Sequence, residues 1–202
     1  MSLEHITIGK FIIDNLTTGM YNDPFCIYRE YIQNAADAID TDAYARNKNV
    51  HKDYEIRINL DPQSSSITIE DNGCGVSVDS AAKTLLSLGD STKTSDRERG
   101  FRGIGRLGGV AYCDTLIFTT KTKGETEETV VEWDCRKVQK LLNRHNVPAR
   151  HLEAKNLIAQ CITIKTQKST KKVDESFFRV AMTGVESVKG ELLDLPKVKS
   201  YI

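Results

Sequence analysis

The segment ITIEDNGCGV, residues 67–76, runs from an apolar strand into an acid and two glycines at alternate positions, Asp71-x-Gly73-x-Gly75. An ionised Asp71 only accepts hydrogen bonds, which suits an exocyclic amine such as the adenine N6. Burying this carboxylate without a donor would be costly, so a bound donor accounts for it. Glycine tolerates positive φ and lacks Cβ, which lets the backbone approach a flat ligand. The same pattern also fits a strand that leaves its sheet through a glycine turn.

A second segment, GFRGIGRLGG at residues 100–109, offers a different chemistry. Gly100, Gly103 and Gly105 form a GxxGxG pattern, and Arg99, which directly precedes it, Arg102 and Arg106 are interleaved with these glycines. Backbone amides freed by glycine at the start of a helix form a nest for phosphate oxygens. No Gly-Lys-Ser/Thr closes the pattern and no apolar strand leads directly into it, so it is neither a Walker A loop nor a Rossmann fingerprint. A flexible surface loop is the alternative interpretation.

A third segment, YREYIQNAADAID at residues 28–40, carries Glu30, Asn34 and Asp37 at positions i, i+4 and i+7. In a helix this spacing places the three polar side chains on one face. A solvated stripe on a surface helix has the same spacing. The neighbouring alanines leave this face small, so that another group can approach it closely, and this favours a ligand-facing helix.

Periodicity and capping residues indicate the elements that would position these segments. Period-two alternation predicts strands at 54–60, 66–70, 115–120, 129–133 and 161–165, paired as two hairpins and a further strand. Helical spacing predicts helices over 7–16, 24–40, 80–88 and 136–143, and over much of 174–202. Hairpins with helices, rather than regular βαβ alternation, predict an α+β sandwich.

Length and composition narrow the possible classes of protein. A chain of 202 residues suits one domain, and its 28 Lys+Arg balance 28 Asp+Glu. This neutrality removes the strongest compositional argument for binding nucleic acid or an acidic membrane. The five cysteines are widely spaced without a CxxC pair, no apolar run approaches the length of a membrane span, and the N-terminus has no signal-peptide pattern. We therefore expect a cytoplasmic protein with reduced thiols and no membrane partner.

Taken in chain order, the segments at residues 28–40, 67–76 and 100–109 resemble the N-box, G1 box and G2 box of the GHKL ATPases, which include gyrase, MutL, histidine kinases and the heat-shock-ninety chaperones. The resemblance covers residues 7–166. IQNAADAID and Ser91-Thr92-Lys93 are most similar to the heat-shock-ninety branch, while GFRG at 100–103 is closer to MutL. The resemblance implies a Bergerat-type two-layer α/β sandwich, with a mixed, mostly antiparallel sheet covered by helices on one face.

The resemblance also implies a role for each matched position. Glu30 would be the general base that orients the attacking water, and Asn34 would coordinate a magnesium ion that bridges the phosphates of ATP. Asp71 would bind adenine, and Asp37 would act through a water at the edge of the base. The other nucleotide-binding positions lie in the glycine boxes and in a lid over 89–106: Gly73, Gly75, Lys93, Gly100, Arg102, Gly103, Ile104 and Gly105.

Two parts of the chain depart from the family pattern. The family places a polar residue on a late strand near the adenine acid, and AQCITI at 159–164 would put Gln160 there, which is a poor match. Residues 1–170 would form the ATP-binding domain, and 171–202 a helical extension that leads to a further domain absent from this chain. Because relatives often complete the site from such a domain, we expect the isolated module to hydrolyse ATP slowly.

The expected function is thus magnesium-dependent binding and slow hydrolysis of ATP by a heat-shock-ninety-like module of a larger chaperone-like protein. ATP and ADP are the expected ligands, and the resemblance allows an ATP-dependent homodimer of the full-length protein. One alternative is the ATPase module of a MutL- or gyrase-like DNA-processing protein, with DNA as a partner. Another is a nucleotide sensor that does not hydrolyse ATP. A histidine kinase is disfavoured because no phospho-acceptor helix precedes residues 24–40.

Overall fold

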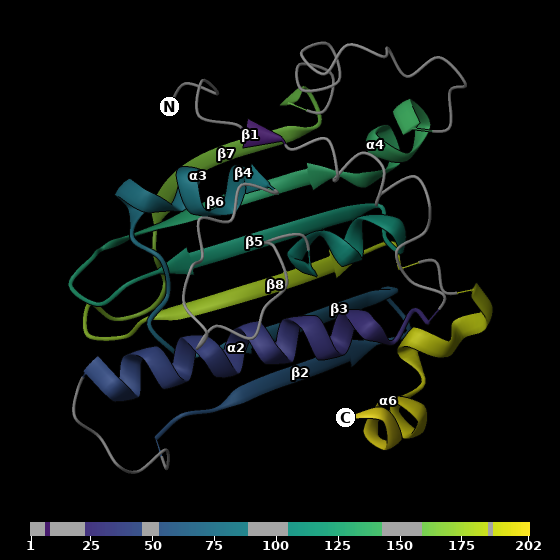
Figure 1. The fold of residues 1–202 in the computed structure, drawn as a ribbon, viewed down its shortest axis with the longest axis horizontal. Coiled ribbons are helices and arrows are strands. Elements are labelled where there is room, and N and C mark those ends of the chain that lie inside the picture. The colour runs from purple at the N-terminus through teal and green to yellow at the C-terminus, as the bar shows by residue number, and fades with distance from the viewer. Residues whose placement is uncertain (1–6, 9–22, 46–52, 89–104, 143–158, 186–187) are drawn as a thin grey trace.

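The structure, a computed structural model, describes residues 7–8, 23–45, 53–88, 105–142, 159–185 and 188–202 (Figure 1). Its centre is a six-stranded sheet in the order β2-β3-β8-β5-β6-β7, in which every neighbouring pair is antiparallel. A separate two-stranded sheet pairs β1 with β4 in parallel. The strands are β1 (Thr7–Ile8), β2 (Ile56–Asp61), β3 (Ser66–Asp71), β4 (Ser87–Leu88), β5 (Thr115–Lys121), β6 (Glu127–Asp134), β7 (Ile162–Lys168) and β8 (Phe177–Thr183).

Helices cover one face of the six-stranded sheet, with α2 lying along the β2–β3 side and α3 nearer β6 (Figure 1). The predicted α+β sandwich with a mostly antiparallel sheet is therefore confirmed, and among the described strands the parallel pair is that of β1 and β4. The helical elements are α2 (Cys26–Ala45), α3 (Val78–Leu86), the 3-10 helix η2 (Gly105–Ala111), α4 (Cys135–Leu142), the 3-10 helix η3 (Val188–Leu193) and α6 (Leu195–Tyr201).

Local chemistry explains why the first hairpin and α2 begin where they do. Asp61 ends β2 and accepts hydrogen bonds from the amides of Gln63 and Ser64, which forms the turn into β3. At the start of α2, the Asp23 carboxylate accepts a hydrogen bond of 2.9 Å from the Phe25 amide, and Pro24 lies between them. Both boundaries follow from the residue types that the sequence offers.

The core lies between the helices and the covered face of the sheet. Along β3 the buried residues alternate, and Ile67, Ile69 and Asp71 face the helices. The largest fully buried side chains include Tyr28 of α2, Trp133 of β6, Phe118 of β5, and Leu85 and Leu86 of α3. Asp71 is thus a carboxylate at the end of an otherwise apolar buried row.

Strand β8 corrects the prediction of a helix over 174–182. Phe178 and Met182 stand at helical spacing, but Phe178, Val180 and Met182 also alternate, and pairing with β3 and β5 decides the outcome. The six-stranded sheet consequently extends beyond residue 170, and the helical part of 171–202 consists of η3 and α6. Thr7 and Ile8, predicted to begin a helix, form β1 instead, because they pair with β4; residues 9–16 lie outside the described part of the chain.

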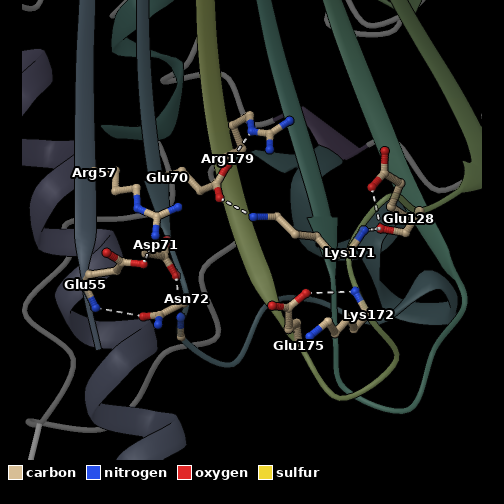
Figure 2. A network of polar contacts seen from close by, with 12 residues as sticks. Glu55, Arg57, Glu70, Asp71, Asn72, Glu128, Lys171, Lys172, Glu175 and Arg179 are labelled. Carbon is tan, nitrogen blue, oxygen red and sulfur yellow. Dashed lines mark hydrogen bonds and ion pairs between the residues drawn. The ribbon is translucent and has the colours of Figure 1, made fainter. Parts of the chain in front are cut away.

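The opposite face of the sheet carries ion pairs, shown in Figure 2. Glu70, which alternates with the buried residues of β3, receives hydrogen bonds from Lys171 Nζ at 2.8 Å and Arg179 Nε at 2.5 Å. Burial by itself would raise the pKa of Glu70, but these two cations outweigh it and lower the pKa. Two cations on this face thus neutralise the charge of Glu70.

None of the helices in the described ranges combines the length and apolar character that crossing a membrane requires. All five cysteines lie in those ranges and none is in a disulfide. Cys113 and Cys135 are both buried, with their sulfur atoms 3.8 Å apart.

Candidate functional site

A cavity of about 550 Å³ lies between α2, α3, η2 and the covered face of the sheet. Its floor is apolar and comes from β3, β5 and β8, through Ile69, Phe118, Phe178 and Val180. Its polar lining comes from α2, the end of β3, α3 and η2, through Asn34, Asp37, Asp40, Thr41, Asp71, Thr84 and Arg106. An apolar slot with a few convergent polar groups is typical of a small-molecule site.

Asp71 lies in this cavity at the end of β3 and is only 4% exposed. Its Oδ1 accepts a hydrogen bond of 2.9 Å from the Gly73 amide. Burial raises the pKa of Asp71 to about 7, with a smaller contribution from the charge of Glu70, although the Gly73 amide favours the ionised form. The carboxylate is therefore poised to ionise fully when a ligand supplies a donor.

The two glycines after Asp71 are required by close backbone contacts. A Cβ on Gly73 would lie 2.7 Å from the carbonyl carbon of Ala38 in α2. Gly75 has a φ of 63°, and a Cβ there would lie 2.1 Å from the carbonyl oxygen of Lys121. The Asp71-x-Gly73-x-Gly75 pattern thus fits the loop tightly between α2 and the end of β5.

Side chains from the end of β5, from the residue after it and from the residue before β8 hold this loop in place. The Val76 amide donates to Thr120 Oγ1 at 2.8 Å, and Thr122 Oγ1 donates to the Cys74 carbonyl at 3.0 Å. Ser176 Oγ donates to the Gly73 carbonyl at 2.5 Å. The loop geometry is therefore fixed by residues distant from it in the sequence.

Gln160, the poor match for the late-strand polar group, lies away from Asp71. Gln160 is exposed and directly precedes the segment that leads into β7, the strand at the opposite edge of the sheet from β2 and β3. The strand beside β3 is β8, and Ser176, which directly precedes it, places a buried hydroxyl next to the Asp71 loop. The alternation of apolar residues over 176–182 indicates a strand, but apolar residues at helical spacing in the same segment favoured a helix.

The predicted polar face of α2 lines the cavity in part. Asn34 is exposed into it, and Asp37 lines it while accepting a hydrogen bond of 2.8 Å from Gln33. Glu30 lies one turn before Asn34 and pairs at 3.6 Å with Arg29, outside the set of cavity-lining residues. Glu30, Asn34 and Asp37 thus lie on successive turns of α2, and the latter two line the cavity.

Glu30 is nevertheless brought against the glycine-rich segment. A Cβ on Gly105 would lie 2.2 Å from Glu30 Oε2, so the carboxylate occupies the space that the glycine leaves open. The other predicted ligands of that segment, namely Lys93, Gly100, Arg102, Gly103 and Ile104, lie outside the described residues.

Within the described ranges, no group of three or more His, Cys, Asp or Glu side chains is placed to hold a metal ion. Asn34 offers one side-chain carbonyl to the cavity. Magnesium keeps several waters and shares phosphate oxygens, so a single protein oxygen suits a metal that arrives with a nucleotide.

This chain is similar to known proteins of one ATPase family. The model of the family described as "Histidine kinase-, DNA gyrase B-, and HSP90-like ATPase" matches residues 25–170. The chaperone protein HtpG of Rhodococcus jostii (strain RHA1) is 28% identical over 148 residues, which are 63% of this chain and 23% of that protein. HtpG of Shewanella pealeana (strain ATCC 700345 / ANG-SQ1) is 26% identical over 143 residues, which are 62% of this chain and 22% of that protein.

The match spans less than a quarter of the length of these curated relatives. The family match itself covers well over half of the chain and includes α2, the Asp71 loop and η2. The predicted resemblance to the GHKL ATPases is thereby confirmed, with HtpG chaperones among its relatives. The chain belongs to the family of histidine kinase-, DNA gyrase B- and HSP90-like ATPases.

Proposed function

We propose that this chain is the ATP-binding module of a heat-shock-ninety-like protein, which binds ATP with magnesium and hydrolyses it slowly. The observation that carries the proposal is the buried Asp71 carboxylate at the end of a 550 Å³ cavity with an apolar floor. A flat base with an exocyclic amine fits both properties, because it fills apolar space and supplies Asp71 with a donor in addition to the Gly73 amide. The similarity to HtpG chaperones supports the same assignment.

In this proposal Asp71 accepts a hydrogen bond from adenine, and Gly73 and Gly75 let the loop approach the base. Asp37 contacts the edge of the base through a water. Asn34 supplies a ligand to magnesium, which would neutralise charge on the phosphates. Glu30 orients the attacking water, and its position against Gly105 supports this role because Gly105 belongs to the proposed phosphate-binding segment.

The remaining predicted positions complete the proposal. A lid over 89–106 would close over the nucleotide, with Lys93, Gly100, Arg102, Gly103 and Ile104 near the phosphates. In the longer protein, lid closure would promote an ATP-dependent homodimer. Residues beyond this module would raise the rate of hydrolysis.

Two substitutions separate binding from turnover. Glu30→Ala should leave ATP affinity within about twofold and lower kcat at least about 100-fold, which is the usual scale of a lost general base. Asp71→Asn should weaken ATP binding, because an amide donor would then face the adenine donor. Calorimetry with magnesium and ATP measures affinity, and phosphate release measures turnover.

Asp79→Asn, an exposed carboxylate on α3, is the matched control. Unchanged hydrolysis in Glu30→Ala would remove the catalytic role of Glu30. Equal affinity in Asp71→Asn and the control would mean that the base binds elsewhere. ATP that stays intact in single-turnover assays of the full-length protein would favour the alternative of a non-hydrolysing sensor.

A second candidate is the ATPase module of a DNA-processing protein, since the family description includes DNA gyrase B and GFRG at 100–103 is similar to MutL. Equal numbers of acidic and basic residues count against it. DNA affinity of the full-length protein that falls steeply with salt concentration would favour this candidate over the chaperone-like one.

A further inference from the structure

Arg106 occupies a specific place at the wall of the cavity. It follows Gly105 in the first turn of η2, and its carbonyl accepts a hydrogen bond of 3.0 Å from the Tyr31 hydroxyl of α2. Its guanidinium Nη1 donates to the carbonyl of Thr84 near the end of α3. The backbone of Arg106 is thus fixed to α2, while its side chain crosses to α3 along the cavity.

The charge of Arg106 contrasts with the rest of the lining. Among the described residues that line the cavity, Arg106 is the one cation, and Asp37, Asp40 and Asp71 are the acids. Within the same residues no carboxylate lies within ion-pair distance of the guanidinium, and burial lowers the pKa of Arg106 with no compensating acid. A guanidinium has five N–H donors and stays protonated, so it retains unused capacity for an anion.

The position of Arg106 along α2 relates it to the adenine site. The Asp71 loop contacts α2 at Ala38, where the Cys74 amide donates to the Ala38 carbonyl at 3.2 Å. Arg106 contacts the same helix at Tyr31, seven residues earlier, which corresponds to about 10 Å along the axis. A nucleotide with its base at Asp71 therefore has room to extend its phosphates past Asn34 toward Arg106.

We propose that the Arg106 side chain binds the phosphate chain of the nucleotide, releasing the Thr84 carbonyl as it does so. This inference rests on the proposed function of the cavity as an ATP site. Arginine matches phosphate geometry with two parallel donors, and a partly desolvated guanidinium without a carboxylate gains most from such a partner. In the bound state the guanidinium donates to a charged phosphate oxygen in place of the neutral Thr84 carbonyl, and this exchange favours binding.

The test measures ATP and adenosine affinity by calorimetry, with magnesium present, for the wild-type chain and for Arg106→Met and Arg106→Lys. Arg106→Met should weaken ATP binding about 10- to 100-fold, the scale of a lost charge-assisted hydrogen bond, and leave adenosine affinity within about twofold. Arg106→Lys should recover part of the ATP affinity because it restores the charge but not the paired donors. Lys83→Met, an exposed cation on α3, is the matched control.

Thermal unfolding of each variant accompanies the titrations, so that a loss of fold is distinguished from a loss of contact. A folded Arg106→Met variant with wild-type ATP affinity would overturn the proposal. Equal weakening of ATP and adenosine would also overturn it, since a structural role affects both ligands alike. A wild-type chain that binds neither ligand would instead overturn the proposed function, and this inference with it.

Discussion

At the scale of single residues, Asp71 has the property that most directly links the structure to a measurable behaviour. Its carboxyl ends the buried side of β3, and burial raises its pKa to about 7 from an ordinary value of 3.8. The free domain therefore exists near neutral pH as a mixture of protonated and ionised forms. A base that donates to the carboxylate binds the ionised form.

We predict that adenosine affinity rises with pH, by about tenfold between pH 6 and pH 8, as Asp71 ionises. Adenosine is the appropriate probe because it carries no group that titrates near pH 7, unlike the phosphates of ATP. Calorimetry across this pH range measures the effect. An affinity that does not change with pH would contradict the assignment of Asp71 as the acceptor.

The same pKa affects the stability of the free domain. The folded protein binds the Asp71 proton more tightly than the unfolded chain does, so this contribution to the free energy of unfolding is fully present below pH 4. It is lost as pH rises from about 4 to about 7. Adenosine added at pH 7 should restore part of the lost stability.

At the scale of elements, Lys121 at the end of β5 ties two connections together beneath the Asp71 loop. Its side chain is fully buried, and its ammonium donates to the carbonyls of Lys172 at 2.8 Å and Glu175 at 2.5 Å. The carbonyls of Thr122 and Glu125 lie at 3.4 and 3.2 Å. One cation thus links the β5–β6 turn to the segment that leads into β8.

Lys121→Met should lower the free energy of unfolding by about 3 kcal/mol, because it leaves buried carbonyls without a donor. Urea denaturation measures the change. Lys123→Met is the matched control, since Lys123 is partly exposed and lies 3.5 Å from Asp42, an interaction worth less than about 1 kcal/mol. Equal stability of the two variants would show that the carbonyls are hydrated or rearrange freely.

Predictability from sequence also differs between elements. The hairpin of β2 and β3 and the start of α2 were predictable, because alternation, the turn at Asp61 and the Asp23 cap are local signals. β8 was not predictable, since its apolar residues fit the helical period as well as the strand period, and its partner strands β3 and β5 are distant in the chain. Ser176 was missed with it, and its contact with Gly73 spans 103 positions.

At the scale of the whole molecule, β8 joins two halves of the sheet. β3 pairs with it on one side and β5 on the other, and Phe178 and Val180 contribute to the cavity floor. η3 and α6 lie after it and pack by the start of α2, where Phe25 and Tyr201 have ring centroids 5.4 Å apart. Within the C-terminal segment, β8 therefore holds the sheet together, whereas η3 and α6 pack by the start of α2.

A chain truncated after Thr170 should fail to fold, because removing β8 leaves β3 and β5 without their common partner. A chain truncated after Val185 should keep the sheet and lose only the contacts of η3 and α6. Circular dichroism and thermal unfolding of the two truncated chains measure the difference. A cooperative unfolding transition in the shorter chain would contradict the central role of β8.

The position of β8 also bears on how the protein is made. The ribosome releases β2, β3, β5, β6 and β7 before the strand that joins them, so the nascent chain holds two partial sheets, each with an unpaired edge. The Ser176 contact with the Asp71 loop and the β8 part of the cavity floor are absent during this interval. We therefore expect the cavity of the proposed nucleotide site to be completed only after residue 183 has emerged, and the unpaired edges to favour edge-to-edge association until then.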